Sequence, residues 1–583
     1  MNEGVDSTDR ALSSLGPKQP LRFVPAEADF NDREQVVRLY EKLLALPADS
    51  AEQIEEFILL RSELESAVHQ HRSILYIRMT CRTDEPERTQ AYRHFVENIE
   101  PAIEELTDRL NHKYIQAGKQ FHINPRRYEV YDRNHQADAD IYRAENIPLT
   151  TRDKLLKQRY QAIAGSMSVN FRGNQYTPAQ MLKFLHEQDR PTRQESWHAA
   201  AQCRLEHSKQ LQELFSEMVQ LRHKTALNSG MENYLQYKFR QYHRFDYTPD
   251  DCRRYHEAVE KHLVPLQKQI WQHRAKQMGL ERLCPWDLAA DPFGRAPLRP
   301  YKDGRKFLEG LQCVYSGLDG RLGRIFSDLV GCGLIDIFNH KGKAPGGYQC
   351  TLDLSVKPFI FANATGLADD LRTMLHESGH AFHAALAGDD RLVDYRHCPT
   401  EFAEVASMSM ELLALPALMV FFNDEELARW RRIQTENIMR LLISVAVNDA
   451  FQHWVYKNPA HDSQQRDSIW VELNRRFGQD TIDWMGLEEI QRCSWQNILH
   501  FYQYPLYYID YGIAQLGAIR IWMRSLSEPA EAMASYKKAL GLGGSRPLPE
   551  LFAAAGLKFD FSEETIAPLS KVLADRWQKV CES

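Results

Sequence analysis

This sequence contains no paired cysteine motif. Its ten cysteines are spread along 583 residues, and no two of them form a C-x-x-C pair. A zinc site built from cysteines is therefore not expected. A chain of this length has enough apolar material for a large core without disulfide bonds, so we expect reduced and mostly buried thiols.

The sequence also lacks a dense basic block, a secretory leader and a long apolar run. Its 72 basic and 79 acidic residues are scattered and give a formal net charge of -7, which argues against nucleic acid as the main partner. The first twenty residues show no basic start followed by an apolar run, and no other apolar run is long enough to span a bilayer. We therefore expect a cytoplasmic protein without membrane association.

Helical periodicity dominates the rest of the sequence. From about residue 31 to residue 282, apolar residues recur three and four positions apart, opposite a charged face. A Pro-, Gly- and Asp-rich stretch at residues 285–304 interrupts this pattern and is the best candidate for a junction between lobes. The predicted organisation is a polar tail, a helical lobe and a catalytic region with a C-terminal helical portion, over residues 1–20, 21–290 and 291–583.

Two short strand signals follow the interruption. Residues 348–354 alternate modestly between apolar and polar, and residues 358–363 (PFIFAN) form an aromatic and β-branched run. We expect the two to pair as a small hairpin. The predicted fold class is therefore mainly α, with a small β-sheet or hairpin beside the motif described next.

The motif H-E-x-x-H begins at His376. Asp369 and Asp370 precede it and can cap a helix that contains it. On a helix, His376 and His380 lie one turn apart, so both imidazoles can reach one metal ion, while Glu377 is offset toward the open coordination position. By composition, such a motif arises by chance in roughly one such chain in twenty, so its surroundings must support it.

A third ligand is expected from a second acidic helix that starts after Pro399. Catalytic zinc needs three protein ligands and keeps one position for water. Glu404 is our choice for the third ligand, and Glu401 and Glu411 are alternatives. Glu411 lies two turns beyond Glu404 and could instead orient a ligand. His383 shares the helix face of the motif and is a rival ligand, although packing or a hydrogen bond is its more ordinary role.

At this point the residues resemble the thimet oligopeptidase and oligoendopeptidase F family of zinc metallopeptidases, and the oligoendopeptidase F side matches better. The family motif is H-E-x-G-H, which Gly379 fits, followed some two dozen residues later by a ligand Glu, which Glu404 fits. The segments GKAPGGYQ at 342–349 and PFIFANATG at 358–366 also look like the family's active-site strands. The resemblance extends from about Leu21 through most of the chain.

A C-terminal segment at residues 500–522 is similar to the family's His and Tyr segment. That likeness implies that His500, Tyr508 and Tyr511 bind the scissile carbonyl and the developing oxyanion. Tyr504 and Tyr507 are the alternatives if the alignment shifts by about one residue. Buried rings at helical spacing are also ordinary packing, which accounts for at least half of the tyrosines here.

The resemblance implies a zinc-dependent endopeptidase for short, unstructured oligopeptides. One Zn²⁺ per chain would be held by His376, His380 and Glu404, with Glu377 as general base. The implied fold is a zincin-like helical ellipsoid of two lobes around a deep channel. We also expect the PFIFAN strand to offer an open edge to an extended substrate. A zinc carboxypeptidase or dipeptidyl carboxypeptidase and a non-catalytic, zinc-stabilised peptide-binding protein are the alternatives. The sequence does not indicate an oligomeric state.

Overall fold

A computed structural model describes residues 3–340 and 342–582. The chain divides into two compact units, each assembled from three separate segments. Unit 1 comprises Met1–Asp140, Arg299–Leu427 and Gly517–Phe559, and unit 2 comprises Ile141–Leu298, Ala428–Leu516 and Asp560–Ser583. The division by sequence position into a tail, a helical lobe and a catalytic region stays a prediction.

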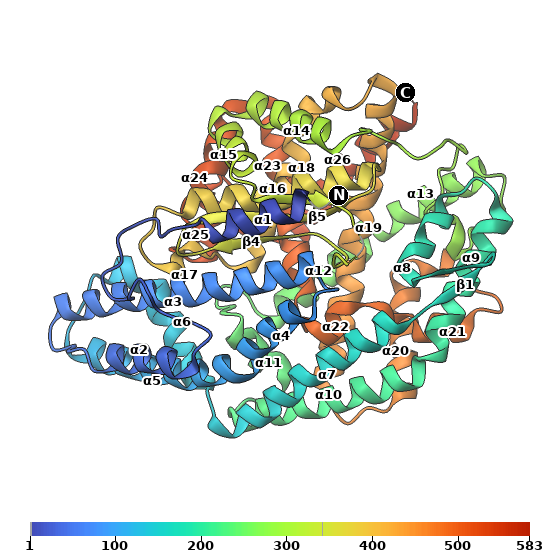
Figure 1. The fold of residues 1–583 in the computed structure, drawn as a ribbon. Helices are drawn as coiled ribbons and strands as arrows, with labels where there is room; N and C mark the ends of the chain where they lie inside the picture. Colours follow the sequence, from blue (N-terminus) through green and yellow to red (C-terminus); the bar gives the residue numbers. More distant parts are fainter. Residues whose placement is uncertain (1–2, 341, 583) are drawn as a thin grey trace. The chain divides into compact units, whose positions relative to one another are not determined.

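Unit 1 is a set of helices with one small sheet. In Figure 1 its helices α2, α3 and α5 lie side by side. The helices of this unit are α1 (Glu3–Ser13), α2 (Arg33–Leu44), α3 (Ala51–Cys81), α4 (Pro86–His94), α5 (Glu100–Gln120), α6 (Pro125–Ile141), α14 (Gly304–Leu318), α15 (Gly320–Gly331), α16 (Ala368–Ala387), α17 (Val393–Arg396), α18 (Thr400–Leu413), α24 (Pro529–Leu540) and α25 (Leu548–Ala554).

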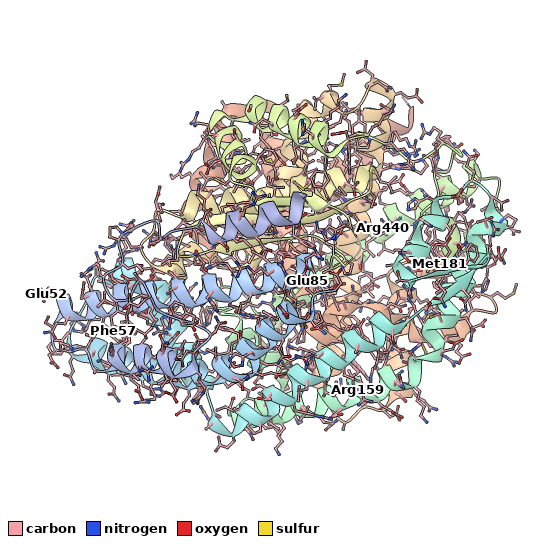
Figure 2. All side chains as sticks on the ribbon, in the orientation of Figure 1. Glu52, Phe57, Glu85, Arg159, Met181 and Arg440 are labelled. Carbon is pink, nitrogen blue, oxygen red and sulfur yellow. The ribbon has the colours of Figure 1, made fainter. Side chains whose placement is uncertain are left out.

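Helix α3 shows how the predicted periodicity becomes structure. Its N-cap is Ser50, whose hydroxyl accepts a hydrogen bond from the backbone N–H of Gln53 at 3.3 Å. Glu52 in the first turn is exposed, whereas Phe57 one and a half turns later is buried in the core of the unit (Figure 2). The helix therefore forms because its cap satisfies a free N–H and its apolar residues pack against α2 and α5.

The sheet of unit 1 has three strands in the order β3-β5-β4. β4 (Tyr348–Leu352) pairs antiparallel with β5 (Lys357–Ala364), which confirms the hairpin expected from the sequence. β3 (Ile335–Phe338), which the sequence analysis did not predict, pairs parallel with β5. Helix α16 packs against both β4 and β5, so the small sheet lies beside the motif as expected.

The prediction that the PFIFAN strand offers an open edge is wrong. β5 is the central strand, with β3 on one side and β4 on the other, so its backbone groups are already paired. Residues 358–362 of β5 are all buried, and an unbroken apolar run is typical of a strand covered on both faces. The outer strands of this sheet are β3 and β4.

Unit 2 consists of long and short helices and one very short hairpin. Helices α7 and α10 run side by side in Figure 1. The helices are α7 (Ile147–Ser166), α8 (Pro178–Met181), α9 (Arg190–Glu206), α10 (Ser208–Asn228), α11 (Tyr234–Gln241), α12 (Pro249–His262), α13 (Val264–Gln277), α19 (Asp424–Lys457), α20 (Ser463–Arg476), α21 (Glu488–Cys493), α22 (Leu499–Gln503), α23 (Tyr508–Ser527) and α26 (Glu563–Glu582), of which α19 and α23 extend across a unit boundary.

The hairpin of unit 2 was not predicted from the sequence. β1 (Val169–Phe171) pairs antiparallel with β2 (Asn174–Tyr176). Arg172 and Gly173 connect the strands with φ angles of 50° and 80°. Two positive φ values in a two-residue loop are the signature of a type I′ turn, for which a glycine at the second position is favourable. Each strand has only three residues, which is too short for an alternation of apolar and polar residues to be recognised in the sequence.

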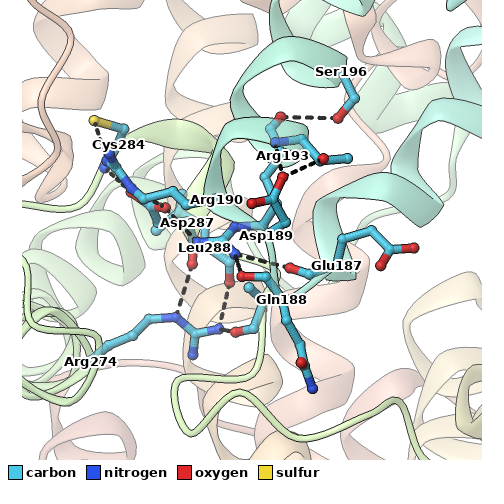
Figure 3. Close-up of polar contacts among 12 residues, drawn as sticks. Glu187, Gln188, Asp189, Arg190, Arg193, Ser196, Arg274, Cys284, Asp287 and Leu288 are labelled. Atoms are coloured by element: carbon cyan, nitrogen blue, oxygen red, sulfur yellow. Dashed lines mark hydrogen bonds and ion pairs between the residues drawn. The ribbon is translucent and has the colours of Figure 1, made fainter. Parts of the chain in front are cut away.

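Near its start, the stretch predicted as a junction contains a buried aspartate that forms ion pairs. Asp287 is fully buried and forms ion pairs with Arg190 at 2.9 Å and with Arg193 at 3.1 Å. The guanidinium of Arg274 donates to the backbone carbonyl of Leu288 at 3.0 Å, and these contacts are drawn in Figure 3. Removing one partner of such a buried pair leaves an uncompensated charge, so this part of the stretch is held firmly in unit 2.

The described residues are mainly helical and contain two small sheets, which confirms the predicted fold class. No helix among residues 3–340 and 342–582 is long and apolar enough to cross a membrane.

Candidate metal centre

Helix α16 carries the H-E-x-x-H motif and is capped by one of the two expected aspartates. Oδ2 of Asp370, in the first turn, accepts the backbone N–H groups of Thr365 at 2.7 Å, Gly366 at 2.7 Å and Leu367 at 3.0 Å. These bonds fix the chain just before the helix. Asp369 instead has an exposed side chain that lies 3.5 Å from the guanidinium of Arg372.

Gly379 allows α16 and α18 to approach closely. A Cβ atom at this position would lie 2.6 Å from Cα of Ser407 and 2.7 Å from the carbonyl oxygen of Ala406. Real Cβ atoms do not come this near to backbone, so only glycine fits without separating the helices. The G of H-E-x-G-H thus brings the acidic helix within reach of the two histidines.

Three donor atoms converge where the two helices meet. Nε2 of His376 lies 3.4 Å from Oε2 of Glu404, and Nε2 of His380 lies 3.7 Å from the same oxygen. All three atoms lie within 4.8 Å of one another. Zinc bonds of about 2.0–2.1 Å at tetrahedral angles place neighbouring ligand atoms about 3.3 Å apart. These residues therefore fit a zinc ion with little rearrangement.

The electrostatics of the two histidines also favour a bound cation at this site. Burial lowers the pKa of His380 to about 4, which leaves the imidazole neutral and able to bind a metal. Burial opposes a positive charge on His376 too, but Glu404 and Glu411 outweigh it and hold the pKa of His376 well above its usual value. The two carboxylates thus make the site attractive to positive charge.

The alternatives for the third ligand have other positions. Oε1 of Glu411 lies 2.8 Å from Nδ1 of His376, on the far side of the ring from the donor cluster, which is the orienting role considered for it. Glu401 is buried but is not a member of the converging group. His383 is also outside that group: its Nδ1 is 3.5 Å from Sγ of Cys398, and burial lowers its pKa to about 3.

Glu377 is buried beside the edge strand β4. Burial raises the pKa of its carboxyl group to about 7, and the carboxylate accepts the backbone N–H of Gln349. Gly347 is also adjacent, since a Cβ there would lie 3.7 Å from Oε1 of Glu377. A carboxyl group with a pKa near neutrality can both accept and return a proton. The strand next to this group is β4, which replaces the PFIFAN strand as the candidate substrate edge.

The histidine and tyrosines of the predicted His and Tyr segment lie in unit 2. Nε2 of His500 is 3.4 Å from the hydroxyl oxygen of Tyr511, and the ring centroids of His500 and Tyr508 are 4.9 Å apart. Burial raises the pKa of Tyr508 to about 12, although a hydrogen bond with Asn448 opposes the shift. Tyr507 also contacts the His500 ring, with centroids 6.0 Å apart. The Tyr504 ring is 5.9 Å from that of His500, so the structure clusters the proposed donors with both of their substitutes.

Buried contacts within unit 2 hold this segment in place. The guanidinium of Arg222 donates to the backbone carbonyl of Phe501 at 2.9 Å. Leu506 has a φ of 64°, a strained conformation for a residue with a Cβ, and its N–H donates to Oε1 of Gln452 at 2.7 Å. Sequence reasoning missed Arg222 and Gln452, because neither lies near the segment in the chain.

Comparison with known families now adds independent information. The model described as peptidase family M3 matches residues 183–570, and the model of the peptidase M3 N-terminal domain matches residues 23–123. The chain belongs to peptidase family M3. This confirms the family resemblance inferred from the H-E-x-G-H motif and its neighbours.

Relatives of this M3 chain include oligopeptidases from several bacteria. It is 23% identical over 313 residues to the plasmid-encoded oligoendopeptidase F of Lactococcus lactis subsp. cremoris, covering 53% of this chain and 50% of that protein. It is also 23% identical over 338 residues to oligopeptidase PepF of Bacillus subtilis strain 168, covering 56% and 48%. The chain thus spans about half the length of the curated relatives it matches.

Solved structures match the M3 chain over nearly its full length. One, described as PZ peptidase A with inhibitor 2, has a TM-score of 0.88 and 25% identity, and the match covers 97% of this chain and 99% of that one. A putative oligoendopeptidase F has a TM-score of 0.87 and 27% identity, with 96% and 99% coverage. The helical fold with small sheets is therefore shared with oligoendopeptidase F structures.

Proposed function

We propose that this M3 chain is a zinc-dependent endopeptidase that hydrolyses short, unstructured peptides. The observation that carries the proposal is the convergence of His376, His380 and Glu404, with spacings of 3.4 Å and 3.7 Å that suit a tetrahedral zinc ion. Two further residues support the proposal: Glu411 contacts the ring of His376, and Glu377 is buried next to His376 in the chain. A site that only stabilised the fold would more often be closed by a fourth protein ligand.

The proposed mechanism assigns distinct tasks to the side chains. When bound, zinc would acidify a water molecule and polarise the peptide carbonyl. Glu377 accepts a proton from the attacking water and returns it to the leaving amine, for which a pKa of about 7 is well suited. An extended peptide along the edge of β4 would form main-chain hydrogen bonds and make few side-chain demands.

The family resemblance adds a further part of the proposal. His500, Tyr508 and Tyr511 would donate hydrogen bonds to the scissile carbonyl and to the oxyanion that develops from it. Their support is the match to peptidase family M3 and the clustering of the three rings within unit 2. The cytoplasmic location expected from the sequence stays a prediction.

One experiment tests metal dependence and cleavage position together. A quenched fluorescent peptide blocked at both ends is incubated with the enzyme, with and without a strong zinc chelator, and the products are analysed by mass spectrometry. Internal cleavage that the chelator abolishes and added zinc restores supports the endopeptidase. Stepwise loss of C-terminal residues from unblocked peptides alone would favour an exopeptidase, and no cleavage of any peptide would favour a zinc-stabilised binding protein.

A further inference from the structure

A second group of side chains of types that can bind a metal lies in unit 2 and is separate from the H-E-x-G-H motif. Helix α12 carries Cys252 and His256, and helix α19 carries Asp449 and His453. Each pair is spaced four residues apart, so its two side chains lie one turn apart on the same helix face. Two helices thus each present a pair of ligand types, C-x-x-x-H and D-x-x-x-H.

The four side chains meet between the two helices. Nε2 of His256 lies 2.9 Å from Oδ2 of Asp449, and Nε2 of His453 lies 3.3 Å from the same oxygen. The Cys252 sulfur, an Asp449 carboxylate oxygen and a ring nitrogen of His453 all lie within 4.8 Å of one another. Tetrahedral zinc places nitrogen and oxygen ligands about 3.3 Å apart and a sulfur ligand about 3.6 Å from either. Cys252, Asp449 and His453 are therefore within reach of one ion, whereas His256 lies outside this group, and its ring would have to turn from Asp449 toward the ion to complete a tetrahedral shell.

Two polar atoms in the cluster are buried without a hydrogen bond. Among the described residues, Oδ1 of Asp449 forms no hydrogen bond, and the contact of Nε2 of His453 with Oδ2 of Asp449 does not have hydrogen-bond geometry, although both residues are buried and Asp449 is fully so. Leaving such a group unsatisfied costs free energy, and the cost is larger for a charged group. An ion at the centre of the cluster would be coordinated by both residues and would remove this cost.

The balance of charges around the cluster is compatible with a bound cation. The nearby Arg244 is paired with Asp510 at 2.6 Å, and both side chains are buried, so they largely neutralise each other. The buried carboxylate of Asp449 contacts the two imidazoles, and the Arg244 charge also acts on it. Zn²⁺ bound by one thiolate and one carboxylate forms a neutral unit, which is far less costly to bury than an isolated charge.

Burial also decides which chemistry is open to the cluster. Cys252, His453 and Asp449 are the residue types of a nucleophilic triad, but Cys252 has no exposed surface at all. A substrate therefore cannot reach its sulfur, and a thiol in such surroundings is inert as a nucleophile. A small ion, in contrast, can be enclosed as the unit folds.

We propose that Cys252, His256, Asp449 and His453 hold a structural zinc ion that joins α12 to α19. Binding replaces the thiol proton of Cys252, which is released to solvent, by a sulfur–zinc bond, and the two histidines bind as neutral imidazoles. Four protein ligands close the coordination shell and leave no position for a reacting water, as in structural zinc sites.

The proposed ion would also support the His and Tyr segment. Asn448, next to Asp449 on α19, forms a hydrogen bond with Tyr508. Gln452, next to His453, accepts the N–H of the strained Leu506 at 2.7 Å. Fixing α19 therefore fixes two residues that position this segment, all within unit 2.

Zinc content of the purified full-length protein tests the proposal. After saturation with zinc and removal of loosely bound ions, we expect two zinc ions per chain in the wild type and one in Cys252→Ser. Glu404→Ala, which removes a ligand of the candidate metal centre, should also retain one, and the double variant should retain none. Cys203→Ser is the matched control, because Cys203 is another buried thiol of unit 2, and it should keep two.

Cobalt substitution of the wild type gives a second readout that needs no variant to fold. A cobalt–thiolate bond produces a charge-transfer absorption in the near ultraviolet, and His376, His380 and Glu404 contain no sulfur to produce it. We expect this absorption in the wild type and in Cys203→Ser, and its loss in Cys252→Ser. One zinc ion per chain in the wild type, or cobalt-loaded protein without the absorption, would overturn the proposal and leave the proposed peptidase activity unaffected.

Discussion

Oε1 of Glu411 lies 2.8 Å from Nδ1 of His376, so a carboxylate on α18 orients a metal-binding ring on α16. This hydrogen bond fixes the ring tautomer and directs Nε2 toward His380 and Glu404. The same helix α18 thus supplies both the candidate third ligand and the residue that aligns the first.

Removing this contact should weaken metal binding without abolishing it. We expect Glu411→Ala to lower zinc affinity by about 10–100-fold, the usual cost of losing a partner of a metal-bound histidine. Glu411→Gln should lose less, because an amide oxygen can still accept the Nδ1–H. Competition with a chelator measures both affinities. Equal affinity in wild type and Glu411→Ala would show that the contact does not orient a ligand.

Glu377→Gln should separate metal binding from chemistry. The glutamine has nearly the same shape but cannot accept the proton from water, so we expect kcat to fall by about 10²–10⁴-fold while zinc content stays unchanged. Peptide hydrolysis and zinc analysis on the same samples check both. Glu404→Ala is the comparison, since it should lower zinc content as well, and undiminished turnover by Glu377→Gln would rule out the assigned base.

Gly379→Ala should disturb the packing of α16 on α18. The new methyl group would lie 2.6 Å from Cα of Ser407, so the helices must separate, at a cost of about 1–3 kcal/mol in unfolding free energy. Glu404 would move away from the histidines, and zinc affinity should fall. Gly118→Ala on α5 is the matched control, because a Cβ there meets nothing within 4 Å, and it should leave stability unchanged or raise it by about 1 kcal/mol. Urea denaturation measures both, and similar effects of the two substitutions would contradict the packing argument.

Loss of a proposed oxyanion donor should affect turnover rather than folding. We expect Tyr511→Phe or Tyr508→Phe to lower kcat by about 10²–10³-fold with zinc content unchanged, since each removes only a hydroxyl group. Tyr504→Phe tests the alternative donor, for which we expect a smaller loss because Tyr504 is 53% exposed. Steady-state kinetics on a single peptide compares the three. A larger loss in Tyr504→Phe would transfer the role to that residue.

Buried His383 should make stability fall in acid. Burial lowers its pKa to about 3 in the folded protein, whereas an unfolded histidine has a pKa of about 6.5. Between these values only the unfolded chain takes up the proton, so stability is fully present above pH 6.5 and is lost as the pH decreases toward 3, by up to about 1.4 kcal/mol per pH unit. Urea denaturation of the chelator-treated wild type and His383→Gln at pH 7, 6 and 5 should give a steeper loss for the wild type. Parallel losses would exclude this contribution.

Much of the candidate site could be predicted because its geometry is local. The positions of His376, Glu377 and His380 follow from the pitch of one helix, and the hairpin of β4 and β5 follows from two strand signals with a short connection. The expectation that no zinc site uses cysteine rested on the lack of C-x-x-C pairs. The proposed cluster does not need such a pair, because Cys252 lies four residues from His256 and its other partners come from a different helix.

The sequence by itself therefore determined the family and the mainly helical class. It also determined the relative positions of the two histidines and the glutamate of the motif, because these have a fixed spacing on one helix. The tertiary structure alone decided that β5 is central and that β4 borders Glu377. The strand order depends on β3, which pairs with β5 on the side opposite β4. The tertiary structure also decided that Asp449 and His453 meet Cys252 and His256, nearly two hundred residues away in the chain. Spacing within a helix is set by backbone hydrogen bonds between near neighbours, whereas contacts between distant helices are set by the packing of the whole core.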